Sequence, residues 1–210
     1  TLQGTTVENR QEQKYTTIQI TKTWLVPSDD DTAAITVQLS QDSAAFATLT
    51  LNGKTCSATC SDSSVKVSYD SSKSTATKWV YNVTVPQNNP DNGGTHAYTI
   101  AEDSLGDGYT SKVDGLSITN TATGKVTLHV EKQWMDIDDK PMADTASIPD
   151  VTVYLTRTSS NHTSAETVKD STRTLTADSL TAKWENLDKY DDQGKAWTYA
   201  IHEGEPGSKT

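Results

Sequence analysis

The sequence lacks the features of a membrane-spanning or nucleic-acid-binding chain. No stretch of it approaches the roughly 20 consecutive apolar residues that a membrane-spanning helix requires. Only 33% of its residues are hydrophobic and Phe occurs once, so any core must be lean. Basic residues are outnumbered, with 18 Lys and Arg against 28 Asp and Glu and a net charge of −10. Because an acidic surface repels phosphate groups, we expect neither nucleic acid nor an anionic membrane as a partner.

Cysteine is almost absent, since Cys56 and Cys60 are the only two in the chain. In an exported protein such a pair would form a small disulfide across a loop or hairpin end, and we predict that disulfide here. A metal site and two free thiols are the alternatives. No further metal ligands are evident nearby, and the acidic loops do not follow the spacing of a dedicated calcium loop. We therefore predict no metal and no cofactor.

Catalytic motifs are lacking as well. No Ser/His/Asp arrangement and no Gly-rich phosphate loop stands out in the sequence. We therefore expect no enzyme in the sense of turning over a substrate.

What the sequence does contain is the alternation of half-buried β-strands. From Ile18 to Trp24 the apolar residues share one parity, which is typical of a strand with one face in a core. Lys22 lies on the same parity and is predicted to point inward. This is unusual, because lysine is almost never fully buried without a partner.

The pattern of the first strand recurs later in the chain. The segment from Val126 to Trp134 alternates in the same way, with Lys132 on the inward parity. Two later features of the first repeat also recur in the second. Trp79 corresponds to Trp184, and the segment Tyr98–Glu102 corresponds to Tyr199–Glu203. In the last pair of segments the Tyr, Ile and Glu share a parity, so Glu102 and Glu203 are predicted to face inward. The repeat from Lys22 to Lys132 has the length of one β-sandwich domain.

A final strand closes the first repeat, with Leu116, Ile118 and Asn120 on its inward face. The segment ending at Asn9 looks like such a closing strand without a domain before it. The predicted organisation is residues 1–13 as the tail of a preceding repeat or an N-terminal extension, 14–123 as a first sandwich with an inserted loop or hairpin at 52–77, and 124–210 as a second sandwich that lacks its last strand.

At these residues the sequence resembles the Cna protein B-type (CnaB) domains of Gram-positive surface adhesins and pilins. The matching elements are the Lys-x-Trp opening, the strands of Trp79 and Trp184, the Tyr-x-x-x-Glu strand and the Ile-Thr-Asn ending. The resemblance implies an all-β fold of two tandem Greek-key, immunoglobulin-like sandwiches.

The resemblance also implies a spontaneous Lys–Asn isopeptide bond promoted by an acidic residue. Lys22 would be the nucleophile, Asn120 the electrophile and Glu102 the proton shuttle. In the second repeat the candidates are Lys132 and Glu203. Their asparagine would be Asn9 of a neighbouring chain, or would come from the next strand of a longer natural protein. An ordinary buried salt bridge with Glu102, or a Lys22 amine that reaches water, is the alternative to the covalent bond.

These observations predict a structural stalk repeat of a bacterial adhesin or pilus, extracellular and anchored to the cell wall through regions outside this sequence. Its partners would be neighbouring repeats or subunits of the same protein. The alternative is a ligand-binding adhesin module that recognises a host component, for which the segment 52–77 would need a concave or aromatic-rich surface. Tyr69 is the only aromatic residue in that segment, which favours the stalk. A polymerising pilus subunit would need a sortase-acceptor motif, and none is seen.

Overall fold

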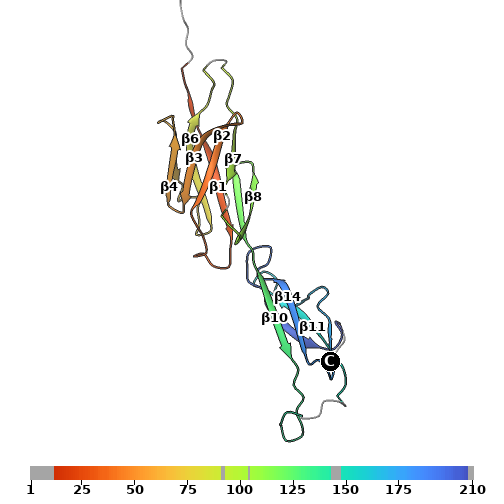
Figure 1. Ribbon diagram of the computed structural model, residues 1–210. Helices are drawn as coiled ribbons and strands as arrows, with labels where there is room; N and C mark the ends of the chain where they lie inside the picture. The colour runs from red at the N-terminus through yellow and green to blue at the C-terminus, as the bar shows by residue number, and fades with distance from the viewer. Residues whose placement is uncertain (1–11, 91–92, 104, 143–147, 208–210) are drawn as a thin grey trace, which may run out of the picture. The chain divides into compact units, whose positions relative to one another are not determined.

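The computed structural model describes residues 12–90, 93–103, 105–142 and 148–207. These contain β-strands but no helix, and hence no helix that could cross a membrane. The chain forms two compact units, Thr1–Thr121 and Ala122–Thr210 (Figure 1). This division lies close to the boundary predicted between residues 123 and 124.

The first unit is a sandwich of two sheets. Its strands are β1 (Tyr15–Leu25), β2 (Ile35–Gln41), β3 (Ala44–Asn52), β4 (Thr55–Cys60), β5 (Lys66–Tyr69), β6 (Lys78–Pro86), β7 (Tyr98–Glu102), β8 (Tyr109–Asp114) and β9 (Ser117–Ala122). One sheet has the order β5-β6-β1-β9-β8 and the other has the order β4-β3-β2-β7. The inner faces of the two sheets enclose the core.

Alternate residues of β1 point into the core of this unit, as the sequence pattern predicts. Ile20, Lys22 and Trp24 are each at most 2% exposed. β6 pairs antiparallel with β1 and places Trp79 opposite Lys22. The lysine is thus enclosed by apolar neighbours on its own sheet.

The pairing of β1 with β9 brings together the two ends of the unit. The two strands run parallel, from Thr21 opposite Ser117 to Leu25 opposite Thr121. Parallel strands need a long crossover connection, and here the connection comprises all the strands from β2 to β8. Because β1 opens the unit and β9 closes it, Lys22 and Asn120 come to lie on adjacent strands.

The predicted insertion at 52–77 adds a strand to each sheet. β4 pairs with β3 at the edge of one sheet, and β5 pairs with β6 at the edge of the other. The segment therefore widens the sandwich, and its turns lie at the ends of the sheets.

The predicted disulfide is wrong, because Cys56 and Cys60 are free thiols. Both lie on β4, opposite Leu51 and Ala47 of β3. Four residues along a strand separate Cα atoms by about 13 Å, whereas a disulfide needs a Cα separation of roughly 4.4–6.8 Å. The alternative of two free thiols is the one that the structure supports.

The second unit is smaller. Its strands are β10 (Lys125–Glu131), β11 (Val151–Thr158), β12 (Glu166–Thr167), β13 (Arg173–Leu175), β14 (Thr181–Asp188) and β15 (Thr198–Glu203). β10 pairs with β14, while β11 pairs with β12, β13 and β15. The buried core consists of Val153, Leu155, Leu175 and Trp184. Among the described residues β10 has no second neighbour, and its inward face is only half-buried.

The free thiols can be counted directly. We expect two reactive thiols per chain when the protein is denatured in the absence of reductant and titrated with a thiol reagent. The variant Cys56→Ser should give one. If the wild-type chain gives none until it is reduced, Cys56 and Cys60 are joined and β4 cannot be a continuous strand.

Candidate functional site

Three polar side chains meet inside the first unit. Lys22 comes from β1, Asn120 from the adjacent β9, and Glu102 from β7 of the opposite sheet. The Lys22 Nζ donates to Glu102 Oε1 at 2.7 Å, and the Asn120 Nδ2 donates to the same oxygen at 3.0 Å. The carboxylate thus holds the amine and the carboxamide at one point.

This cluster is closed to solvent. Lys22 and Asn120 are 0% exposed, and the Glu102 side chain is 2% exposed. The inward direction predicted for all three residues is confirmed by these values. The alternative in which the Lys22 amine reaches water is wrong, since the whole side chain is enclosed.

Burial changes the acid–base behaviour of Lys22. Desolvation lowers its pKa to about 8, while the hydrogen bond and the charge of Glu102 act in the opposite direction. The Nζ also lies 4.4 Å from the ring centroid of Trp24. Lys22 is therefore far closer to being a neutral amine at neutral pH than a solvated lysine is.

The second carboxylate oxygen of Glu102 has a hydrogen-bond partner, whereas the carboxamide oxygen of Asn120 has none among the described residues. Glu102 Oε2 accepts a hydrogen bond from Ser111 Oγ of β8 at 2.5 Å. Asn120 Oδ1 is buried and has no hydrogen-bond partner. An unpaired buried acceptor costs about 1–3 kcal/mol, so the carboxamide is held in an unfavourable state.

Ser111 is a member of the site that the sequence analysis missed. It follows Tyr109 by two residues on β8, and the Tyr109 ring packs against Trp24 at 5.4 Å. The parity shared with Tyr109 is the only signal in the sequence that could have indicated it. The sequence gives no means of knowing that β8 passes close to Glu102.

Comparison with known proteins identifies the family. Residues 18–121 and residues 128–208 each match the Cna protein B-type domain. The chain belongs to the Cna protein B-type domain family. The predicted all-β fold of two tandem Cna B-type domains is confirmed by these two matches and by the strands of the structure.

Two solved structures resemble the chain. Two B repeat units (B1B2) of the collagen binding protein (Cna) of Staphylococcus aureus show 22% identity over 91% of this chain, with a TM-score of 0.35. A single B repeat unit (B1) of that collagen binding surface protein shows 20% identity over 90% of this chain, with a TM-score of 0.32. The chain spans 43% of the first of these chains and 86% of the second. No curated protein matches it.

The second Cna B-type unit repeats part of this arrangement. The Lys132 Nζ lies 2.8 Å from Glu203 Oε1 and 4.9 Å from the ring centroid of Trp134, as Lys22 lies beside Glu102 and Trp24. Here, however, the side chains are 24% and 58% exposed. The expectation that Glu203 faces into a core is wrong.

The physical reason is the absence of a covering strand. In the first Cna B-type unit β9 lies along the end of β1 that carries Lys22. In the described part of the second unit no strand occupies that position, and Lys132 lies beyond the end of β10. Asn9, the asparagine suggested by the sequence, lies outside the described residues.

One group of possible metal ligands occurs among the described residues, formed by His162, Asp191 and Asp192. The Asp191 carboxylate is already used within its own loop. It accepts hydrogen bonds from Ser159 and Asn161 side chains and from the backbone N–H groups of residues 193 and 195. This carboxylate shapes the turn between β14 and β15.

The two Lys–Glu pairs should differ sharply in what they contribute to stability. In an Asn120→Ala background, where no isopeptide bond can form, Glu102→Gln should destabilise the first unit by about 3–5 kcal/mol, because it leaves a buried ammonium without its partner. The matched change Glu203→Gln should cost the second unit less than about 1 kcal/mol, because that pair is exposed.

The measurement is denaturant unfolding followed through amide NMR signals of each unit. Equal effects of the two substitutions would show that burial of Lys22 is not the source of the difference.

Proposed function

We propose that the first unit forms a covalent amide between Lys22 and Asn120, and that the chain is a load-bearing stalk segment of a bacterial surface protein. The observation that carries the proposal is the convergence of Lys22 Nζ and Asn120 Nδ2 on one buried oxygen of Glu102. A lysine with a lowered pKa, a carboxamide and a proton carrier are the three components of this reaction.

The first step moves a proton. Glu102 Oε1 lies 2.7 Å from Lys22 Nζ and takes a proton from the ammonium, which leaves a neutral amine. The nitrogen lone pair then attacks Cγ of Asn120. In well-oriented reactions, holding the reacting groups in place lowers the activation free energy by about 7–11 kcal/mol.

The second step releases ammonia. Nδ2 of Asn120 is the leaving nitrogen, and it lies 3.0 Å from the carboxyl oxygen that now carries the proton. Glu102 gives this proton to Nδ2 and receives another from the attacking nitrogen. The Cγ–Nδ2 bond breaks as the Cγ–Nζ bond is completed, so ammonia leaves and Glu102 ends protonated. The reaction happens once per chain, and the chain is the reactant, not an enzyme.

The position of the bond explains its use in a stalk. It joins β1 to β9, so tension that enters before β1 and leaves after β9 crosses the amide and bypasses the strands from β2 to β8. Closing a loop of this length also lowers the entropy of the unfolded chain. In the loop-closure model this raises the free energy of unfolding by about 4–5 kcal/mol. A lean core benefits from both effects.

The proposed setting is the outside of a Gram-positive cell, with anchoring to the wall through other regions of the protein. The membership of the Cna protein B-type domain family supports this setting. Neighbouring repeats or subunits are the proposed partners. In the second unit, Lys132 and Glu203 would react only with a strand that supplies an asparagine, for which Asn9 of a neighbouring chain is the candidate.

The intact mass of the reduced, denatured chain tests the bond. We expect a deficit of one ammonia per chain, and a digest that yields one peptide joining the Lys22 and Asn120 segments. Lys22→Met and Asn120→Ala should each restore the full mass, while the matched change Lys132→Met should keep the deficit. A wild-type mass equal to that of the sequence would make Lys22 and Glu102 an ordinary buried pair and remove the covalent part of the proposal.

Single-molecule pulling tests the mechanical role. The wild-type first unit should release no chain between Lys22 and Asn120, because the amide closes that loop. The Lys22→Met variant should release on the order of 300 Å in one step, given 3.3–3.6 Å per residue. Identical extension traces for the two proteins would contradict a load-bearing bond even if the mass deficit were found.

A further inference from the structure

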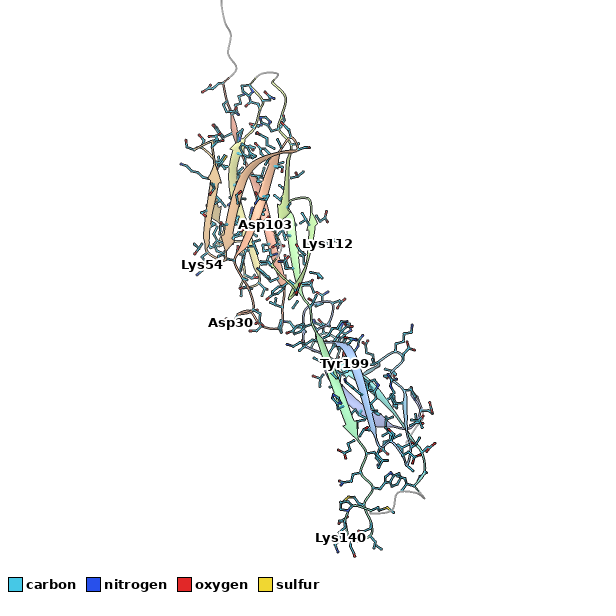
Figure 2. The ribbon with its side chains drawn as sticks, viewed as in Figure 1. Asp30, Lys54, Asp103, Lys112, Lys140 and Tyr199 are labelled. Atoms are coloured by element: carbon cyan, nitrogen blue, oxygen red, sulfur yellow. The ribbon has the colours of Figure 1, made fainter. Side chains whose placement is uncertain are left out.

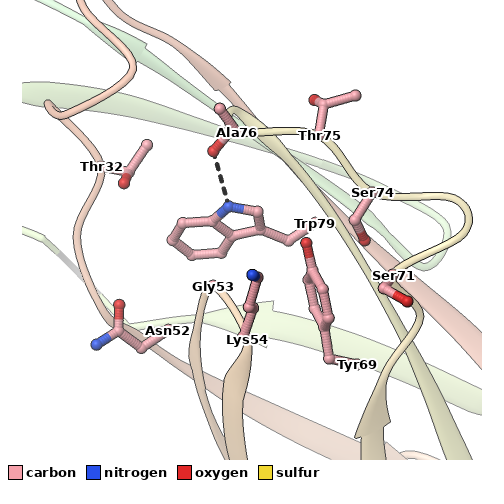
Figure 3. A pocket seen from close by; sticks show the side chains of 10 residues that line it. All are labelled: Thr32, Asn52, Gly53, Lys54, Tyr69, Ser71, Ser74, Thr75, Ala76 and Trp79. Atoms are coloured by element: carbon pink, nitrogen blue, oxygen red, sulfur yellow. Dashed lines mark hydrogen bonds between the residues drawn. The ribbon is translucent and has the colours of Figure 1, made fainter.

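A cleft of about 490 Å³ lies at one end of the first unit, where turns from both sheets meet. Lys54 reaches it from the turn between β3 and β4 (Figure 2). Tyr69, half-buried at the end of β5, forms its aromatic wall, and Trp79, near the start of β6 and only 3% exposed, lines it from the core (Figure 3). The volume falls in the range of sites that hold small organic ligands. The inserted segment 52–77 therefore helps to form a concave surface, to which it contributes its one aromatic residue, Tyr69. We call this site the Lys54 cleft.

The walls of the Lys54 cleft are fixed by internal hydrogen bonds. The carbonyl of Gly53, a residue with φ of +54°, accepts from the buried hydroxyl of Tyr81 at 2.7 Å, which ties the turn between β3 and β4 to the opposite sheet. The Trp79 Nε1 donates to the carbonyl of Ala76 at 3.0 Å (Figure 3). Ser74 Oγ accepts from the Val80 N–H and donates to the Asp70 carbonyl. A cleft held in this way is largely preformed, which lowers the entropic cost of binding.

The polar side chains of the cleft are available to a ligand. Thr32, Asn52, Lys54 and Ser71 line it, and none of their side chains makes a hydrogen bond or ion pair with another described residue. In Figure 3, Lys54 and Tyr69 both extend toward Trp79. The cleft thus combines an aromatic wall with hydroxyl, amide and ammonium groups that have no other role in the fold.

The cleft is lined by a positive charge, although the chain as a whole is negatively charged. The chain carries a net charge of −10, yet the residues that line the cleft include Lys54 and no Asp or Glu. The nearby Asp70 is directed to Ser72, Asn82 and Lys73. A ligand with a carboxylate would therefore meet one free cation and no lining carboxylate.

We propose that the Lys54 cleft binds an acidic saccharide, with a sugar ring against Tyr69, its carboxylate at Lys54 and its hydroxyls at Asn52 and Ser71. A peptide fits less well, because peptide recognition commonly uses open main-chain groups. Here Asn52 pairs with Thr55 across the β3–β4 turn, and Tyr69 pairs with Tyr81 of β6. At Asn52 and Tyr69 the side chains are therefore the groups offered to a ligand, which suits a compact ligand rich in hydroxyl groups.

The test is an NMR titration of the whole chain with two acidic probes, a glucuronate–N-acetylglucosamine disaccharide and sialyllactose, and with the methyl ester of whichever probe binds. We expect amide shifts confined to residues 52–54 and 69–79. The ester, which lacks the charge, should bind about tenfold more weakly, as expected for the loss of one charge-assisted hydrogen bond. Lys54→Met should weaken the acid to the same extent. Lys112→Met, which removes an exposed lysine of β8 (Figure 2), should leave it unchanged.

Three results would overturn the proposal: no shifts with either acidic probe up to about 10 mM, the millimolar limit of weak binding; equal binding of acid and ester; or tighter binding of an acidic dipeptide at the cleft. None of these results bears on the bond between Lys22 and Asn120, because the ammonia deficit of each variant is measured separately.

Discussion

The first unit is organised around one carboxylate oxygen that receives two hydrogen bonds in a core closed to solvent. Glu102 Oε1 holds both the amine of Lys22 and the carboxamide of Asn120. Burying an ion pair has a desolvation cost that often exceeds the attraction between the charges, and the unpaired Asn120 Oδ1 adds to this cost. A core this lean can tolerate such groups only if they stabilise the protein in some other way. The proposed amide does so, because it replaces the buried ammonium of Lys22 and the carboxamide of Asn120 by one neutral group.

The second unit shows that residue type and spacing alone do not create this environment. Lys132 lies beside Glu203 and Trp134 much as Lys22 lies beside Glu102 and Trp24. The difference is that β9 covers Lys22, whereas no described strand covers Lys132. An ion pair exposed to solvent contributes little to stability. Exclusion of water by a neighbouring strand is therefore what distinguishes the Lys22 pair, on which the proposed reaction depends, from the Lys132 pair.

Strand parity in the sequence was enough to predict β-strands and the inward direction of Lys22, Glu102 and Asn120, since alternation fixes the face of a strand. The resemblance to Cna B-type domains added the prediction of two tandem sandwiches. It could not predict contacts that depend on which strands become neighbours. Ser111 joins the site only because β8 passes Glu102, and the Lys54 cleft exists only because turns from two sheets meet at one end of the sandwich. The predicted disulfide failed for a related reason. The spacing of Cys56 and Cys60 suits a loop, but the pairing of β4 with β3 extends that segment and separates the thiols.

The parallel pairing of β1 with β9 has a consequence even without a covalent bond. The two strands point in the same direction, while the chain enters the unit at the beginning of β1 and leaves it at the end of β9. A force applied to the two ends therefore slides the strands past each other along their length. In this shear geometry the inter-strand hydrogen bonds are strained together, whereas in a peeling geometry they would break one at a time. The topology of the sandwich thus gives mechanical resistance to the newly folded unit before any bond between Lys22 and Asn120 exists.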